Sequence, residues 1–209
     1  MMETGELKLL SSVTCVKICA FMGCGDLRRV IWPERLGWIE DAAFCATGLE
    51  EAVLPEGLKG IGEDAFSNCP CLVKVVLPST VEYVGPWLAS ASPVFEGVVS
   101  RSPHFYVEND ALICADNGAL LCCWSREKTY AVPAGVKRIL GFSNRFVEEI
   151  CVGQPLEGVG WDAFCNCGAL RKVSFADVRD FRPGALNWLR DAVVEVEGER
   201  IDAGTYSHV

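Results

Sequence analysis

The feature that most constrains this chain is an internal repeat of 22 or 23 residues. The segment from Leu49 reads LEEAVLPEGLKGIGEDAFSNCPC, and the next, from Leu72, reads LVKVVLPSTVEYVGPWLASASP. Both carry apolar residues at relative positions 1, 4, 6, 10 and 13, Pro at position 7 and Gly at position 14. Self-similarity at such a period is typical of a solenoid, in which every unit is one supersecondary element.

Further copies extend the repeat over most of the chain. Units that begin at Leu27, Val147 and Leu170 fit the same pattern, and the steps Leu27 to Leu49, Leu49 to Leu72 and Val147 to Leu170 are 22, 23 and 23 residues. Partial units lie at residues 13–24 and 130–144. The sequence therefore predicts about six units that stack on one another.

The chemistry of one unit predicts its local structure. Val75 and Leu77 alternate with Lys74 and Val76, which indicates a short strand with one face turned inward. Pro78 lacks a backbone donor and ends the strand. In the unit before it, Gly62 allows a tight bend, and we expect a helical turn to begin at residues 63–66. A single unit cannot bury its own apolar face, so neighbouring units must bury it together.

At these positions the chain resembles the BspA-like leucine-rich repeats. The segments IGEDAFSNC from Ile61 and VGWDAFCNC from Val159 carry the pattern, whereas the Leu72 unit has Leu88-Ala89 in place of Ala-Phe. The resemblance implies a curved solenoid with one strand of every repeat on the same side. It also implies a protein that adheres to partner proteins, often as a bacterial surface or secreted protein.

The period fails from about Phe95 to Lys128. Asn117-Gly118 lies between two apolar runs, and this dipeptide is a strong signal for a β-hairpin turn. Near the C-terminus, Val193–Val196 is strand-like and could close the last repeat, and the polar residues after Gly198 are expected to fray.

We therefore predict an α+β repeat solenoid that forms a single structural domain, with a continuous sheet of short strands on one side. Its segments are an N-terminal partial repeat or cap (1–26), leucine-rich repeats (27–94), a β-hairpin insertion (95–128), leucine-rich repeats (129–189), and a C-terminal cap and tail (190–209).

Charge and hydropathy exclude several classes of partner. The formal net charge of −9 argues against a grip on nucleic-acid phosphates or on anionic lipid, since both need clustered Lys and Arg. No segment approaches about 18 uninterrupted apolar residues, so no membrane span is expected. The N-terminus lacks the features of a secretory signal. These observations favour a cytoplasmic location, with a secreted or cell-surface location as the alternative if the chain is truncated.

The twelve cysteines and two histidines offer little catalytic chemistry. We expect mainly reduced thiols that pack as small apolar groups, and Cys24, Cys69 and Cys167 each lie three residues after the Phe of a repeat. Up to six disulfides are the alternative for an exported protein. No C-x-x-C pair indicates zinc, and only His104 and His208 could assist a cysteine nucleophile. We expect no metal, no cofactor and no enzymatic activity; a thiol-dependent enzyme or a metal protein is the competing hypothesis.

The outward face of the predicted strands is the first candidate binding surface. By alternation it holds Arg29, Ile31, Glu51, Val53, Lys74, Val76, Glu149, Cys151, Lys172 and Ser174. The charges alternate from repeat to repeat. They could serve a protein partner, or they could simply neutralise one another along the ladder, where an exposed pair contributes only about 0–1 kcal/mol.

Aromatic residues outside the core pattern form a second candidate surface. Trp38 and Tyr83 occupy the same repeat position, and Trp161 lies in a turn. Exposed Trp and Tyr are common interface anchors, and packing between neighbouring repeats is the alternative. Together these features predict a non-enzymatic module that binds a protein partner. An intracellular regulator or inhibitor, even an acidic mimic of nucleic acid, is the runner-up, and a surface adhesin is a further alternative.

Overall fold

The computed structural model describes residues 5–189 and 191–202. Its contacts divide the chain into two compact units, Met1–Val107 and Glu108–Val209. The boundary lies inside the segment predicted as an insertion, whereas the sequence predicted a single structural domain. Each unit is described by itself, and β10 (Phe105–Glu108) crosses the boundary between them.

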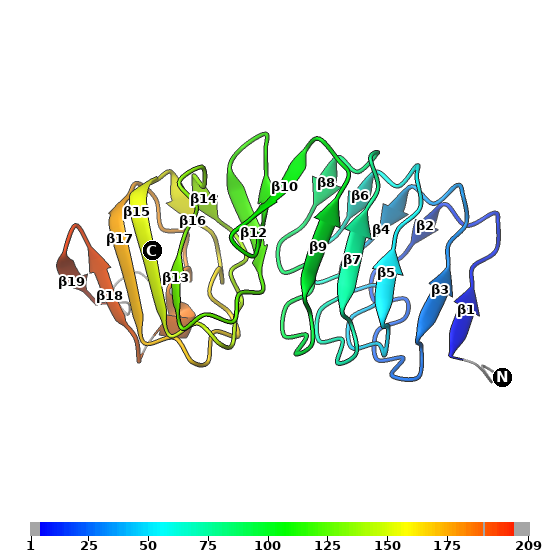
Figure 1. The fold of residues 1–209 in the computed structure, drawn as a ribbon, viewed down its shortest axis with the longest axis horizontal. Coiled ribbons are helices and arrows are strands. Elements are labelled where there is room, and N and C mark those ends of the chain that lie inside the picture. The colour runs from blue at the N-terminus through cyan, green and yellow to red at the C-terminus, as the bar shows by residue number, and fades with distance from the viewer. Residues whose placement is uncertain (1–4, 190, 203–209) are drawn as a thin grey trace. The chain divides into compact units, whose positions relative to one another are not determined.

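The repeats of the first unit carry parallel strands on two sides (Figure 1). One side of the repeats carries the strands β1 (Glu6–Lys8), β3 (Arg29–Ile31), β5 (Glu51–Val53), β7 (Lys74–Leu77) and β9 (Gly97–Ser100). A second side carries the two-residue strands β2 (Cys15–Val16), β4 (Trp38–Ile39), β6 (Gly60–Ile61) and β8 (Tyr83–Val84). Paired residues on neighbouring strands lie one whole repeat apart in the sequence. For example, Ala52 pairs with Val75, and Val75 pairs with Val98. The strand β9 therefore belongs to the repeats although it lies beyond residue 94, where the first set of repeats was predicted to end.

The predicted continuous sheet is wrong in two respects. The second sheet was not predicted at all, because two-residue strands such as Gly60–Ile61 are too short to show alternation. The first side is also interrupted. β1 pairs with β3, and β7 pairs with β5 and with β9, but β3 and β5 belong to separate sheets. At this break the Arg28 guanidinium donates to the Gly25 and Gly48 carbonyls.

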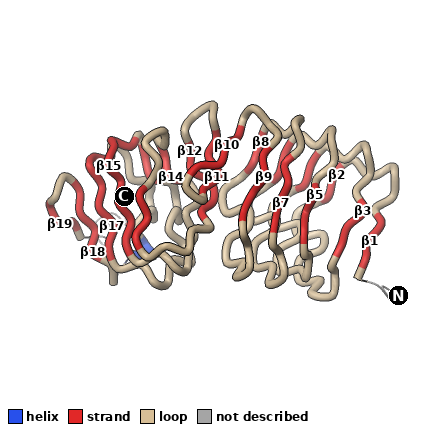
Figure 2. The backbone as a smooth tube through the Cα atoms, in the orientation of Figure 1, coloured by secondary structure: helices blue, strands red, loops and turns tan. Residues whose placement is uncertain are grey.

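The helical turn predicted at residues 63–66 is also wrong, and with it the α+β description. Asp64 and Asn68 have φ angles of 54° and 57°, far from the helical value of about −63°. Equivalent left-handed residues recur four apart in the neighbouring turns, as in Ala42 and Ala46. Among the described residues the only helix is the 3-10 turn η1 (Asn187–Leu189), as Figure 2 shows by its colour. The fold is a repeat β-solenoid of about eight turns.

Backbone hydrogen bonds between repeats replace the helix on this third side. The amide of Phe44 donates to the Ala65 carbonyl, and the amide of Phe66 donates to the Leu88 carbonyl, both at 2.9 Å. Such bonds satisfy backbone groups that would otherwise lie unpaired beside the core. The repeats are thus bonded to one another on all three sides.

The core of the first unit is built from the apolar positions of the repeat. Leu49, Leu58 and Ile61 are fully buried, as are their counterparts in the next repeat except Val84, which is nearly so. The rings of Phe21, Phe44 and Phe66 stack in sequence, with centroids 5.2 and 5.6 Å apart. Ala43-Phe44 and Ala65-Phe66 are fully buried and fill the core, as their apolar character predicts.

Glycine after the second strand allows the turns of neighbouring repeats to approach closely. A Cβ atom on Gly62 would lie 2.5 Å from the backbone nitrogen of Asp41, and one on Gly85 would lie 2.6 Å from the backbone nitrogen of Glu63. Real Cβ contacts of this length essentially never occur. This approach explains why Ile61 and Val84 are each followed by glycine.

The second unit also carries strands on two sides, and several of them are longer. One sheet holds β13 (Thr129–Ala131), β15 (Glu149–Leu156), β17 (Lys172–Val178), β18 (Val193–Val196) and β19 (Glu199–Ile201), and a second side carries β11 (Ala111–Cys114), β12 (Ala119–Cys123), β14 (Arg138–Ile139) and β16 (Gly158–Val159). The strand predicted at Val193–Val196 is confirmed, and β19 folds back against it in antiparallel pairing. The residues after Gly198 were predicted to fray, which is wrong for Glu199–Ile201 because they pair in β19. Residues after Asp202 lie outside the described residues.

The predicted hairpin is present, with a different turn. β11 and β12 pair in antiparallel fashion on either side of Asn117-Gly118. Four residues connect the strands, and of the dipeptide only Gly118 has a positive φ, 67°. The Gly118 amide donates to the Cys114 carbonyl at 2.9 Å.

A buried asparagine organises one turn of the second unit. The Asn144 side-chain nitrogen donates to the Ser125 carbonyl at 2.8 Å, and its side-chain oxygen accepts from the amides of Phe146 and Val147 at 2.8 and 3.1 Å. Beside it the Phe142 ring packs against the rings of Tyr130 and Phe164. This amide holds a turn that lacks the full Gly-x-x-Ala-Phe pattern.

Candidate protein-binding surfaces

The outward residues of β3, β5, β7 and β9 form the strand face of the first unit. Alternation places Arg29, Ile31, Glu51 and Val53 outward, and all four are exposed. Glu51 lies opposite the half-buried Lys74 in the register. Arg29 lies opposite Glu6, with a nitrogen–oxygen distance of 4.0 Å. Charges of opposite sign therefore adjoin along this face.

Exposed apolar side chains form a second row across these strands, beside the charged row. Ile31, Val53 and Val99 are 37%, 49% and 47% exposed. Val76, which alternation predicted to be exposed as well, is only 6% exposed. It lies opposite Val53 on one side and Val99 on the other, so neighbouring strands flank it on both sides. Val99 was missed because its strand lies in the segment where the sequence period fails.

The break between β3 and β5 leaves a groove in this face. The groove has a volume of about 410 Å³ and is lined by Arg29, Val30, Trp32, Glu50, Glu51 and Val53. Its lining thus combines apolar side chains with charges of both signs, a composition suited to a protein partner.

The predicted strand-face residues of the second unit lie on β15 and β17. Glu149 pairs with Lys172 in the register, and Cys151 pairs with Ser174. The Lys172 ammonium lies 2.9 Å from the Glu195 carboxylate, which raises the pKa of Lys172 and lowers the pKa of Glu195. Neutralisation between neighbouring strands, the alternative to partner binding, therefore accounts for Lys172.

Two of the three predicted aromatic residues meet on the second sheet of the first unit. The rings of Trp38 and Tyr83 stack with centroids 5.8 Å apart and planes at 17°. Gly60 lies between them in the register, and a Cβ atom there would clash with the Trp38 ring. We call Trp38, Gly60 and Tyr83 the aromatic shelf. Both rings stay partly open to solvent, with Trp38 38% and Tyr83 46% exposed.

Trp161, the third predicted aromatic residue, belongs to the second unit. It is 62% exposed and approaches Gly184. The sequence reasoning missed Trp188, which is 57% exposed and donates from its indole nitrogen to the Asp162 carboxylate at 2.9 Å. Trp188 lies in the last repeat, where the pattern is weakest, so no repeat position drew attention to it.

Carboxylates border the aromatic shelf. Burial raises the pKa of Tyr83, and the negative charges of Glu63 and Asp41 raise it further. Burial, with the charges of Asp41 and Asp64, likewise raises the pKa of Glu63. The Asp41 carboxylate accepts from the Glu63 amide at 2.9 Å. The shelf thus lies in a negative local field.

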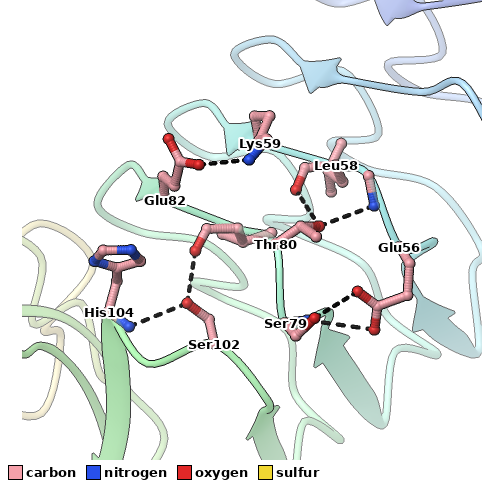
Figure 3. Close-up of polar contacts among 10 residues, drawn as sticks. Glu56, Leu58, Lys59, Ser79, Thr80, Glu82, Ser102 and His104 are labelled. Atoms are coloured by element: carbon pink, nitrogen blue, oxygen red, sulfur yellow. Dashed lines mark hydrogen bonds and ion pairs between the residues drawn. The ribbon is translucent and has the colours of Figure 1, made fainter.

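A polar ladder holds the corner between the two sheets of the first unit (Figure 3). The Ser79 hydroxyl donates to the Glu56 carboxylate at 2.8 Å, and the Thr80 hydroxyl donates to the Leu58 carbonyl at 2.9 Å. One repeat further, the Ser102 hydroxyl donates to the Val81 carbonyl at 2.6 Å and accepts from the His104 amide. The His104 backbone is thus part of this corner.

The cysteines divide into buried and accessible groups. Cys69 and Cys167 are buried as their repeat position predicts, whereas Cys24 is half-buried. Burial raises the pKa of Cys123 and of Cys167 to about 12, which makes both thiols poor nucleophiles at neutral pH. Cys19 and Cys151 are exposed.

The remaining classes to consider are a metal protein and a membrane-spanning protein. Within residues 5–189 and 191–202, no group of three or more His, Cys, Asp or Glu side chains is placed to hold a metal ion. None of the described segments forms a helix long and apolar enough to cross a membrane. His208 lies outside the described residues.

Comparisons with known proteins agree with this geometry. The family model for the BspA type leucine rich repeat region matches residues 2–94. A crystal structure of a leucine-rich repeat protein from Eubacterium ventriosum is similar, with a TM-score of 0.63, 14% identity, and coverage of 93% of this chain and 75% of that one. The pneumococcal vaccine antigen PcpA is similar with a TM-score of 0.61 and 19% identity; the match covers 92% of this chain and 62% of PcpA. At these identities the likeness shows the fold alone. No curated protein matches the sequence.

Proposed function

We propose that this chain, whose residues 2–94 match the family model for the BspA type leucine rich repeat region, is a non-enzymatic module that binds a protein partner. The binding surface is the strand face of the first unit, centred on the groove between β3 and β5. Repeat solenoids present extended surfaces of this kind, and their function depends on the surface residues rather than on the architecture.

The observation that carries this proposal is the row of exposed apolar side chains beside the groove. Ile31 and Val53 lie on the two strands that flank the break, and both expose more than a third of their surface. Arg29 and Glu51 lie on the same strands and add charges of opposite sign. An apolar centre with a polar rim is the usual composition of a protein–protein interface.

The test is affinity capture from cells of the source organism, with the purified chain as bait. Val53→Asp places a charge in the centre of the face, and Leu10→Asp places the same charge at another exposed apolar residue of the unit, 73% exposed. We expect a protein that is captured by the wild type and by Leu10→Asp to be lost with Val53→Asp. A second variant with Arg29, Glu51 and Lys74 all changed to Ala should weaken the same capture.

Equal circular dichroism spectra and urea midpoints must accompany the comparison, so that loss of capture reports the surface and not the fold. Equal capture by Val53→Asp and by the wild type would exclude the strand face as the site.

A further inference from the structure

The aromatic shelf is an unusual feature for the outer side of a short-stranded sheet. The register brings Cys15, Trp38, Gly60 and Tyr83 into one row across β2, β4, β6 and β8. Because Gly60 has no side chain, the Trp38 ring lies directly over the backbone of the next repeat. The result is a flat π surface at the exterior, held in place by stacking and therefore ordered before any partner arrives.

Core packing does not require these rings. The apolar residues of the same repeats that fill the interior, such as Leu36, Ile39 and Leu58, are fully buried. Trp38 and Tyr83 lie on the opposite side of their strands and keep about two fifths of their surfaces exposed. The stacking of the two rings orders them and leaves this exposed area available.

The charge next to the shelf is negative. Asp41 and Glu63 are both exposed, lie just after β4 and β6, and act on the Tyr83 hydroxyl. The two lysines close to this row in sequence are already engaged, since Lys17 contacts Glu40 at 2.7 Å and Lys59 contacts Glu82. The carboxylates of Asp41 and Glu63 thus remain to complement a cation from outside.

We propose that the aromatic shelf and the carboxylates of Asp41 and Glu63 form a docking site for an arginine-bearing segment of the protein partner. A guanidinium is planar, stacks on an aromatic face and donates in a fork to carboxylates, whereas an ammonium is compact and strongly hydrated. The site therefore takes arginine in preference to lysine. This inference rests on the proposed function and adds to it the chemistry of the partner at a second surface.

The probe is a capped decapeptide with three arginines separated by glycine and serine, titrated into the full chain by isothermal calorimetry. A second peptide carries lysine at the same three positions. We expect the arginine peptide to bind about threefold more tightly than the lysine peptide, because stacking on an exposed ring gives a modest gain. Equal binding of both peptides would reduce the effect to net charge and overturn the assignment.

Variants locate the site. Asp41→Asn with Glu63→Gln keeps the shape and removes two charges, and should weaken the arginine peptide about fivefold. Asp26→Asn with Glu34→Gln removes the same two charges elsewhere in the unit, at exposed residues, and should leave the dissociation constant within about twofold. Equal weakening by the two pairs would overturn the proposal.

The ring is tested separately. Tyr83→Leu should weaken binding of the arginine peptide about threefold, whereas Tyr83→Phe, which keeps the ring, should bind like the wild type.

Absence of heat with the wild-type chain at millimolar peptide would also overturn the proposal. If Val53→Asp still abolished capture of a partner in that case, the proposed function would stand without it. If the peptide bound but no partner were captured, the shelf would stand and the proposed function would fail.

Discussion

Gly62→Ala is the sharpest test of how the turns of this solenoid pack. The added Cβ atom would lie 2.5 Å from the backbone nitrogen of Asp41, where an ordinary contact is 3.4–4 Å. About 1 Å of separation must therefore be created between two backbones, and neither can move as a flexible side chain would. The same movement strains the bond from the Cys19 amide to the Asp41 carbonyl, 3.0 Å long, and the bond from the Gly62 amide to the Ile39 carbonyl, 2.8 Å long.

The magnitude follows from three contributions. Overpacking costs about 1–3 kcal/mol, and weakening of a buried backbone bond adds roughly 0.5–1.5 kcal/mol. Replacing glycine also restricts the unfolded chain, which stabilises the folded state by about 0.4–1 kcal/mol and offsets part of this loss. The net expectation is a loss of about 2 kcal/mol in the free energy of unfolding. For a chain of this length that loss lowers the melting temperature by roughly 4–8 °C.

Gly25→Ala is the matched control. Gly25 lies in the same unit, and a Cβ atom there would have no heavy atom within 4 Å. The control should be neutral or more stable by about 0.4–1 kcal/mol, since only the effect on the unfolded chain remains. Urea unfolding followed by tryptophan fluorescence measures both variants. We expect the slope of the unfolding free energy against urea concentration to stay unchanged. If Gly62→Ala unfolded at or above the wild-type midpoint, the close approach of the turns would not be a constraint and the explanation of the Ile-Gly pattern would fail.

Four further outcomes are expected. Phe66→Ala removes a fully buried, stacked ring and should lower the free energy of unfolding in urea by about 3–5 kcal/mol; a loss under 1 kcal/mol would contradict its place in the core. Asn144→Ala leaves two amides and a carbonyl unpaired. We therefore expect a loss of about 3 kcal/mol in the free energy of unfolding and faster hydrogen exchange at those amides. Unchanged exchange would refute the assignment. The raised pKa of Glu63 means that the folded state prefers the protonated carboxyl and loses that stability as pH rises through this pKa. Glu63→Gln should therefore stabilise by about 0.5 kcal/mol or less at pH 7 and not at pH 3, as urea midpoints at both pH values would reveal. In thiol titration of the native chain, Cys151 should react rapidly and Cys123 only on unfolding; comparable rates would contradict the burial.

Much of the architecture could be predicted from local pattern. Val75 and Leu77 alternate with Lys74, and Pro78 follows, so the strand and its end were both predictable. The second side of the repeat could not be found this way, because Gly60–Ile61 offers only two residues and one of them is glycine. The α+β description failed because Ala-Phe after an acidic pair favours a helical turn locally, while the bonds to the next repeat impose left-handed residues at Asp64 and Asn68.

The candidate surfaces divide in the same manner. Alternation placed Ile31 and Val53 correctly on the outside, since each lies on a regular strand. It failed for Val76, whose exposure depends on its neighbours across two strands rather than on its own sequence. The stacking of Trp38 on Tyr83 depends on Gly60, a residue from the repeat between them, and only the register reveals that relation. The groove at β3 and β5 depends on an interruption of pairing that no local pattern indicates.

The bonding of neighbouring repeats on three sides restricts how such a chain can change in length during evolution. Loss of one residue inside a repeat would displace at least one of the two sheets or the turn ladder relative to the others. Loss of the 23 residues from Leu49 to Cys71 would instead join Gly48 to Leu72, a residue that occupies the same repeat position as Leu49. Recombination in whole units is thus the route by which lineages can lengthen or shorten the first unit, while single-residue insertions and deletions should be confined to the connections at its corners.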